Sequence, residues 1–195
     1  MKTVAIVVTL ILLLGAIGIT VYVEVPSDYK LEVLSTDGQA KALVLYHPSR
    51  DAHFSDELSL AVADGLKAAG LSVDRATLNG DTPASPQGYA LVAVVSNTFW
   101  FTPDLPTLRY LARTRMEGQP VIGLIGGAGS TDRSQRMLDD ALRQAEAKVI
   151  QTRSFWISRP NDEKRMSEPN RQVAQDMAKQ FGAKSGRSVL ETRKL

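Results

Sequence analysis

The stretch that decides the fold is YALVAVVSNTFWFTP at 89–103, in which an apolar run leads directly into three consecutive large aromatic residues. A continuous apolar run rich in valine is typical of a strand buried on both faces of a sheet. The rings of Phe99, Trp100 and Phe101 would then lie at the rim of that sheet, and three neighbouring rings cannot all point inward. The loop therefore predicts a platform on which a planar ligand stacks. The alternative is that one or two of the rings complete the core below the loop.

Apolar strands and helical patterns alternate on both sides of this stretch. Strands are expected at 40–46, 71–78, 89–95 and 120–125 and from Lys148 onward, and amphipathic helices at 55–69, 105–115, 134–147 and 169–181. This alternation is the pattern of an open parallel sheet with helices on both faces. Because ligands of such sheets bind beyond the carboxyl ends of the strands, the loops at 47–54, 96–102 and 126–132 are the candidate site.

The N-terminus carries an uncharged apolar segment from Val4 to Val23. As a helix it would reach about 30 Å, the thickness of a bilayer's hydrocarbon core. We expect 1–25 to be an uncleaved membrane anchor. The competing interpretation is a cleaved secretory signal, but no A-x-A-like site follows the segment. Lys2 precedes it and Glu24 and Asp28 follow it, which favours a topology with the N-terminus inside and the soluble domain outside the cytoplasm.

The composition of the remaining chain indicates its segments and limits the functions that it can have. We expect a polar spacer at 26–39, a single domain at 40–182 and a disordered basic tail at 183–195. The chain has 23 Lys and Arg against 21 Asp and Glu and no long basic run within the domain, so nucleic acid is not implied. It has no cysteine and only two histidines, so no metal centre is expected. Redox chemistry would therefore have to come from a cofactor.

Three motifs occupy the candidate loops. They are Tyr46-His47-Pro48 leading to His53-Phe54-Ser55, Phe99-Trp100-Phe101-Thr102-Pro103 followed by Leu108 and Arg113, and Gly126-Gly127-Ala128-Gly129. With these motifs the chain from about 40 to 181 resembles the flavodoxin-like superfamily, and the first two resemble its NAD(P)H quinone reductase branch. The resemblance implies an α/β fold with a doubly wound five-stranded parallel sheet, here preceded by one N-terminal transmembrane helix. It also implies an FMN cofactor that passes electrons or hydride to a quinone-like small molecule or a redox partner protein.

The resemblance also implies which residues hold FMN. The phosphate would lie in the first loop, the ring would stack on the second, and the third would meet the pyrimidine edge of the ring. The residues so implied are Ser49, Arg50, His53, Phe54 and Ser55 in the first loop, Asn97, Thr98, Phe99, Trp100 and Phe101 in the second, and Gly126, Gly127, Ala128 and Gly129 in the third. A phosphate at the start of the first helix would use backbone N–H groups, the helix dipole and the Ser55 hydroxyl. No side chain is an evident acid or base, so no catalytic residue is expected.

The first loop departs from the flavodoxin pattern because it contains no glycine and is followed by Asp56 and Glu57, which would repel a phosphate. The alternative is that Ser55 is an ordinary N-cap. Two functions therefore stay open: an FMN-dependent electron-transfer protein or oxidoreductase, and a flavin-free binding or scaffold module at the membrane. A hydrolase is disfavoured, because no Gly-x-Ser-x-Gly motif occurs and neither histidine has an evident carboxylate partner in the sequence.

Overall fold

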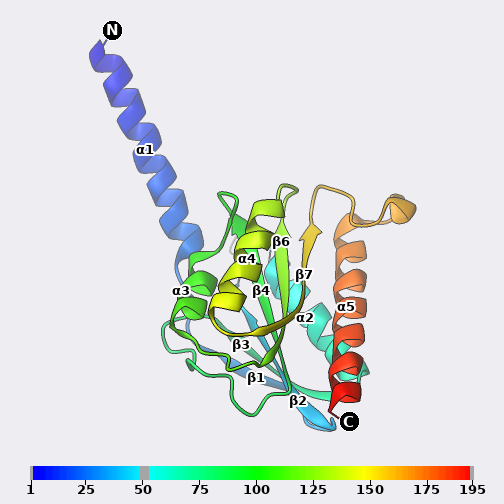
Figure 1. The fold of residues 1–195 in the computed structure, drawn as a ribbon. Helices are drawn as coiled ribbons and strands as arrows, with labels where there is room; N and C mark the ends of the chain where they lie inside the picture. The colour runs from blue at the N-terminus through cyan, green and yellow to red at the C-terminus, as the bar shows by residue number, and fades with distance from the viewer. Residues whose placement is uncertain (1, 49–52, 194–195) are drawn as a thin grey trace.

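The computed structural model describes residues 2–48 and 53–193. Its helices are α1 Lys2–Glu24, α2 Phe54–Ala68, α3 Leu105–Arg113, α4 Asp132–Gln144 and α5 Asn170–Thr192, with a short 3-10 turn η1 at Glu163–Arg165. Its strands are β1 Leu31–Ser35, β2 Ala40–Tyr46, β3 Leu71–Thr77, β4 Leu91–Phe99, β5 Thr102–Pro103, β6 Pro120–Gly127 and β7 Lys148–Trp156. Figure 1 shows helices packed on both sides of one twisted sheet, with α1 projecting from the domain.

The sheet has the strand order β1-β3-β2-β4-β6-β7. The pairs β3–β2, β2–β4, β4–β6 and β6–β7 are parallel, so the predicted five parallel strands are confirmed. The sheet as a whole is mixed, because β1 adds an antiparallel edge to β3 and β5 pairs antiparallel with β4. The prediction of an all-parallel sheet is wrong at these two places. It missed β1, LEVLS at 31–35, because this strand is short and lies between polar residues, so the whole segment 26–39 was interpreted as a spacer.

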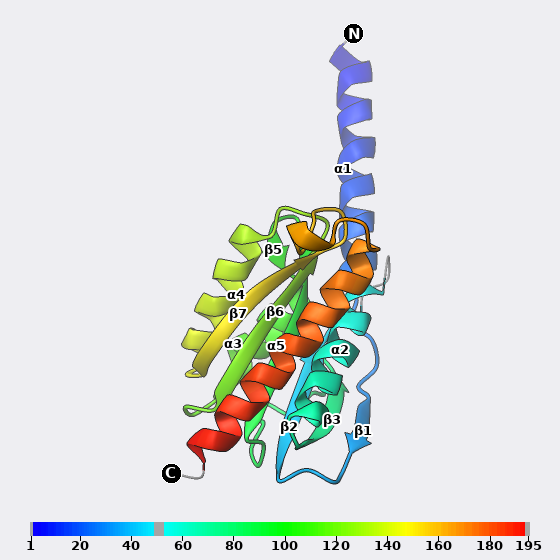
Figure 2. The same cartoon turned by 90° about the vertical axis from the view of Figure 1, so that its right-hand side faces the viewer.

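Two apolar layers lie on opposite faces of the sheet because neighbouring residues of a strand point to opposite sides. In β2, Val44 packs in the core under α2 and α5, whereas Leu43 and Leu45 pack in the core under α3 and α4. Figure 2 shows α5 and α2 together on one face and α3 and α4 on the other. The doubly wound arrangement brings the carboxyl ends of the parallel strands to one edge.

Helix α5 continues to Thr192, so the prediction of a disordered tail is wrong for 183–192. The helix was predicted to end at 181, but Gly182 lies in the middle of α5 and packs against α2. A Cβ on Gly182 would come within 2.5 Å of the Val62 carbonyl oxygen, and one on Gly186 within 2.7 Å of the Ala69 Cβ. These glycines therefore serve the close approach of two helices and do not mark a helix end.

Helix α1 contains one segment, Val4–Glu24, that is long and apolar enough to cross a membrane. Its apolar side chains are exposed, and the helix rises past the edge at which the parallel strands end (Figure 1). The chain after it is held by the domain. Asn79 Nδ2 donates to the Ser27 carbonyl oxygen at 3.0 Å, and Thr77 Oγ1 donates to that of Asp28 at 2.8 Å. The segment predicted as a spacer is therefore part of the folded domain.

Candidate functional site

An open groove lies at the carboxyl edge of the sheet, between the loops that follow β4, β6 and β7. Its volume is about 620 Å³. We call it the aromatic groove, and it is lined by Thr98, Trp100, Phe101, Ala128, Gly129, Ser130, Ser158 and Arg159. The structure thus brings together the second and third predicted loops. Sequence reasoning missed Ser158 and Arg159, because nothing in a single sequence indicates that the end of β7 reaches this groove.

Trp100 and Phe101 form the tip of a tight hairpin between β4 and β5. Thr98 pairs with Pro103 and Phe99 with Thr102, which leaves the two aromatic residues as the turn. Their φ angles are 47° and 61°, in the left-handed region that a two-residue type I′ hairpin turn requires. Bulky residues rarely adopt it, and strain of this kind concentrates at functional sites.

The exposure of the three rings decides between the platform and the core interpretation. Trp100 is 62% exposed and Phe101 is 56% exposed, so neither ring completes the core. Phe99 is half-buried and packs edge-on against Trp100, with 5.7 Å between the ring centroids. Two large aromatic surfaces thus stand at the mouth of the groove. Their role as a flavin platform stays a prediction.

Thr98 lines both the aromatic groove and a smaller cavity behind it, of about 150 Å³. Its Oγ1 is buried and has no hydrogen-bond partner among the described residues. Gly127 leaves room beside it, since a Cβ there would lie 3.2 Å from Thr98 Oγ1. A buried hydroxyl without a partner is costly, so this atom suits a polar group of a bound ligand.

The smaller cavity contains a buried polar network that sequence reasoning missed. Asp104 Oδ2 accepts hydrogen bonds from Ser96 Oγ at 2.7 Å and from the Asn97 N–H at 2.8 Å. Its Oδ1 accepts from the Thr107 N–H at 2.9 Å, which makes Asp104 the N-cap of α3. His47 Nδ1 lies 3.7 Å from the same oxygen, so one histidine does have a carboxylate neighbour. An Asp just before Leu-Pro was a helix-start signal that could have identified the cap.

The start of α2 is the region predicted to hold a phosphate. Ser49 and Arg50 lie outside the described residues. His53 is exposed and is the N-cap of α2, so the alternative that Ser55 is the N-cap is wrong. Ser55 is fully buried; its hydroxyl donates to the His47 carbonyl oxygen at 2.7 Å and accepts from Asn97 Nδ2 at 3.1 Å. Phe54 is a core residue that also lines the smaller cavity.

The two acids of the first turn of α2 are paired with arginines. Asp56 pairs with Arg75, which is itself buried, lies 3.8 Å from the ring centre of Tyr46 and also bonds Glu32. Burial raises the pKa of the Tyr46 hydroxyl to about 12.

Glu57 Oε2 accepts from Arg171 Nε of α5 at 2.5 Å. The acids thus hold β3 and α5 against the start of α2. Because each is partly neutralised, they repel an anion less than the sequence alone suggests.

The glycine loop after β6 is shaped by packing at its first two glycines. A Cβ on Gly126 would lie 3.1 Å from Phe54 Cδ1, and one on Gly127 would lie 2.7 Å from Thr131 Cγ2. Gly129 is different, because its Cβ would meet only Arg159 Cβ, at 3.7 Å. Ala128 lies between them, and its carbonyl oxygen accepts from the Ser158 N–H at 3.0 Å. Only the part from Ala128 onward therefore faces the aromatic groove.

No family model and no curated protein sequence matches the chain. Solved structures do match it. A flavodoxin from the domain Archaea is 16% identical with a TM-score of 0.56, and the match covers 77% of this chain and 99% of that chain. Flavodoxin 1 from Bacillus cereus is 11% identical with a TM-score of 0.58, covering 75% and 97%. A WrbA-like flavodoxin from Agrobacterium tumefaciens is 12% identical with a TM-score of 0.55, covering 78% and 99%. The chain has a flavodoxin-like fold, as the motifs predicted.

Proposed function

We propose that this chain is a membrane-anchored flavodoxin-like protein that binds FMN and passes electrons or hydride to a small acceptor or a partner protein. The observation that carries the proposal is the aromatic groove, which is lined by two exposed rings and by Thr98, whose buried hydroxyl has no partner among the described residues. The smaller cavity beside the groove adjoins the point where the strand order reverses, between β2 and β4, since it is lined by His47 after β2 and by Asn97 of β4. Ligands of open α/β sheets bind at that point.

Particular residues would hold the cofactor. Trp100 or Phe101 would stack on the flat ring, and Thr98 Oγ1 would hydrogen-bond one of its polar atoms. The backbone of 128–130 would meet the ring edge, and the guanidinium of Arg159 would favour a ligand with negative charge. The phosphate would lie toward the start of α2, near His53 and the predicted residues Ser49 and Arg50. FMN would supply the redox chemistry, whereas the chain would bind and orient it.

The anchor in this proposal is α1. Its Val4–Glu24 segment matches a bilayer by length and composition. Lys2 before it and the acids after it favour the N-terminus inside and the domain outside the cytoplasm. A C-terminal reporter enzyme that is active only outside the cytoplasm should therefore be active on the full chain. Activity only of a cytoplasmic reporter would reverse the orientation.

A second candidate function is a flavin-free module at the membrane. The buried Ser55 hydroxyl favours it, because that hydroxyl already donates to the His47 carbonyl oxygen and would have to give up this bond to serve a phosphate. In this alternative the groove binds another planar ligand or a partner, and the fold is retained without its cofactor.

Titration of the purified full chain in nanodiscs with FMN, and separately with riboflavin, tests the proposal. Flavin fluorescence reports binding. FMN binding much tighter than riboflavin binding would support both the ring site and a phosphate site. Equal binding would restrict the site to the aromatic groove. No binding of either flavin would overturn the proposal in favour of the flavin-free module.

A further inference from the structure

The last turn of α1 is attached to the edge of the candidate site. Trp100 Nε1 donates to Thr20 Oγ1 of α1 at 3.3 Å. Val23 lines the smaller cavity behind the aromatic groove. Glu24 Oε2 accepts a hydrogen bond at 2.6 Å from the Leu105 N–H, at the start of α3. The apolar helix therefore ends directly on the loops that form the site.

The chain that follows α1 is too short and too firmly bonded to let the domain move away from the helix. His47 Nε2 lies 3.4 Å from the Val25 carbonyl oxygen, one residue after the helix ends. The Ser27 and Asp28 carbonyl oxygens are bonded to Asn79 and Thr77. Within a few residues of α1 the chain is thus fixed to the ends of β2 and β3. The carboxyl edge of the sheet must stay close to whatever surrounds the end of α1.

Trp100 stands beside a part of α1 that belongs to its apolar segment. Thr20 precedes Glu24 by four residues, or about 6 Å along a helix axis. If Glu24 lies at the bilayer surface, Trp100 lies at the depth of the interfacial region, where tryptophan is enriched in membrane proteins. Phe101 adjoins it at the same strained tip and is also exposed. Two large rings held outward beside a membrane span have the chemistry of an interfacial anchor.

We propose that Trp100 and Phe101 insert into the interfacial region of the bilayer that α1 crosses, so that the carboxyl edge of the sheet lies against the membrane. The partner of this surface is the lipid bilayer itself. The aromatic groove, whose mouth these rings form, then opens at the lipid surface. Figure 1 and Figure 2 show α1 rising from this edge and away from the domain. The inference rests on the proposed anchoring by α1, but it does not depend on FMN.

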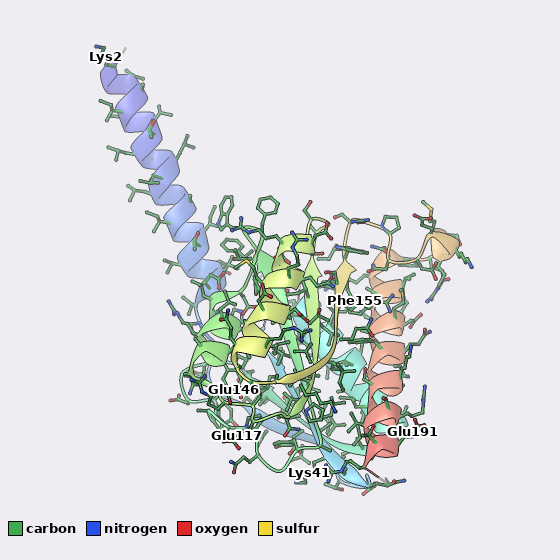
Figure 3. The ribbon with its side chains drawn as sticks, in the orientation of Figure 1. Lys2, Lys41, Glu117, Glu146, Phe155 and Glu191 are labelled. Carbon is green, nitrogen blue, oxygen red and sulfur yellow. The ribbon has the colours of Figure 1, made fainter. Side chains whose placement is uncertain are left out.

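Quenching of tryptophan fluorescence by lipids brominated in their acyl chains tests the insertion. The chain has two tryptophans, so Trp156→Phe leaves Trp100 as the reporter. The full chain would be reconstituted in phosphatidylcholine vesicles with and without brominated lipid. Two controls start from the Trp100→Phe and Trp156→Phe background: Leu12→Trp reports on α1, and Glu191→Trp reports on the opposite end of the domain, where Glu191 lies in Figure 3.

The inference expects brominated lipid to remove most of the Trp100 emission, as for the Leu12→Trp variant, and to leave the Glu191→Trp variant unquenched. If the Leu12→Trp variant is quenched but Trp100 behaves like the Glu191→Trp variant, the insertion is overturned and the anchoring stands. If the Leu12→Trp variant is not quenched, the anchoring fails and the insertion fails with it.

A second measurement covers the case in which Trp156→Phe does not fold. The chain has no native cysteine, so Phe101→Cys and Glu191→Cys can each carry a single spin label on the wild-type background. Label at position 101 should collide with dissolved oxygen more than with a water-soluble nickel chelate, and label at 191 should show the reverse. The same preference for the chelate at both positions would overturn the insertion.

Discussion

Polar groups at the start of α2 are hydrogen-bonded within the protein, whereas the aromatic groove has two exposed rings, and the Thr98 hydroxyl of its lining is buried without a partner among the described residues. The Ser55 hydroxyl, Asp56 and Glu57 bond the His47 carbonyl, Arg75 and Arg171 in turn. Across the same edge, Trp100 is exposed at a strained turn and Thr98 Oγ1 has no partner among the described residues. One half of the site stabilises the fold, and the other half is available to a ligand. Substitutions in the two halves should therefore separate stability from binding.

The largest loss of stability is expected from Asp104→Ala. Asp104 lies between the start of α2 and the aromatic groove. The carboxylate accepts three hydrogen bonds inside the protein and caps α3. Its removal leaves buried donors unsatisfied and should lower the free energy of unfolding by about 2–4 kcal/mol. Denaturant unfolding of the full chain in detergent measures this. Asp104→Asn is the matched control and should lose less, because its amide oxygen can still accept. Equal unfolding midpoints for wild type and Asp104→Ala would contradict the network.

Ser55→Ala tests the half that stabilises the fold. The change removes the bond to the His47 carbonyl oxygen and deprives Asn97 Nδ2 of an acceptor, which should cost about 1–3 kcal/mol of stability. FMN affinity should change little, because the hydroxyl is engaged inside the protein. Unfolding and flavin titration on one preparation give both numbers. A large loss of FMN affinity with unchanged stability would show that the hydroxyl serves the phosphate.

Trp100→Ala tests the half that is available to a ligand. The ring is mostly exposed, so stability should change by less than about 0.5 kcal/mol. If the ring stacks on the flavin, FMN binding should weaken by about 1–3 kcal/mol. The Phe101→Ala variant should behave in the same way. The Phe99→Ala variant should instead have a lower free energy of unfolding, because the Phe99 ring is half-buried. Loss of stability in all three variants with unchanged flavin affinity would contradict a platform.

The sequence predicted the parts of this fold that depend on local patterns. The apolar run at 40–46 is a strand with the bounds predicted, and the parallel order followed from the alternation of strands and helices. Errors arose where one residue type serves two purposes. A glycine such as Gly182 is typical of a helix end. Here it permits close contact between α5 and α2, which only the tertiary structure shows. The segment containing β1 was predicted to be a spacer, because this edge strand is only five residues long and polar residues flank it on both sides.

The candidate site was less predictable than the fold. The loops that converge could be named from topology, since the carboxyl ends of parallel strands share one edge. Their side-chain partners could not. Nothing in the sequence relates Asp56 to Arg75, Asp104 to His47, or Thr20 to Trp100, because these pairs meet only through the tertiary structure. The exposure of Trp100 and Phe101 likewise depends on the two-residue turn, which is strained for such side chains.

The smallest effect is expected from the acids at the start of α2, and it has opposite signs for binding and stability. If FMN binds with its phosphate there, Asp56→Asn with Glu57→Gln removes two negative charges near the dianion and should tighten binding by about 0.5–1 kcal/mol for each. The same change weakens the pairings with Arg75 and Arg171, so the free energy of unfolding should fall. Titration at low and high salt checks the electrostatic origin, because the gain should shrink as salt rises. Riboflavin, which lacks the phosphate, is the control and should bind both proteins alike. Unchanged FMN affinity at low salt would place the phosphate away from α2 and leave the aromatic groove as the whole of the flavin site.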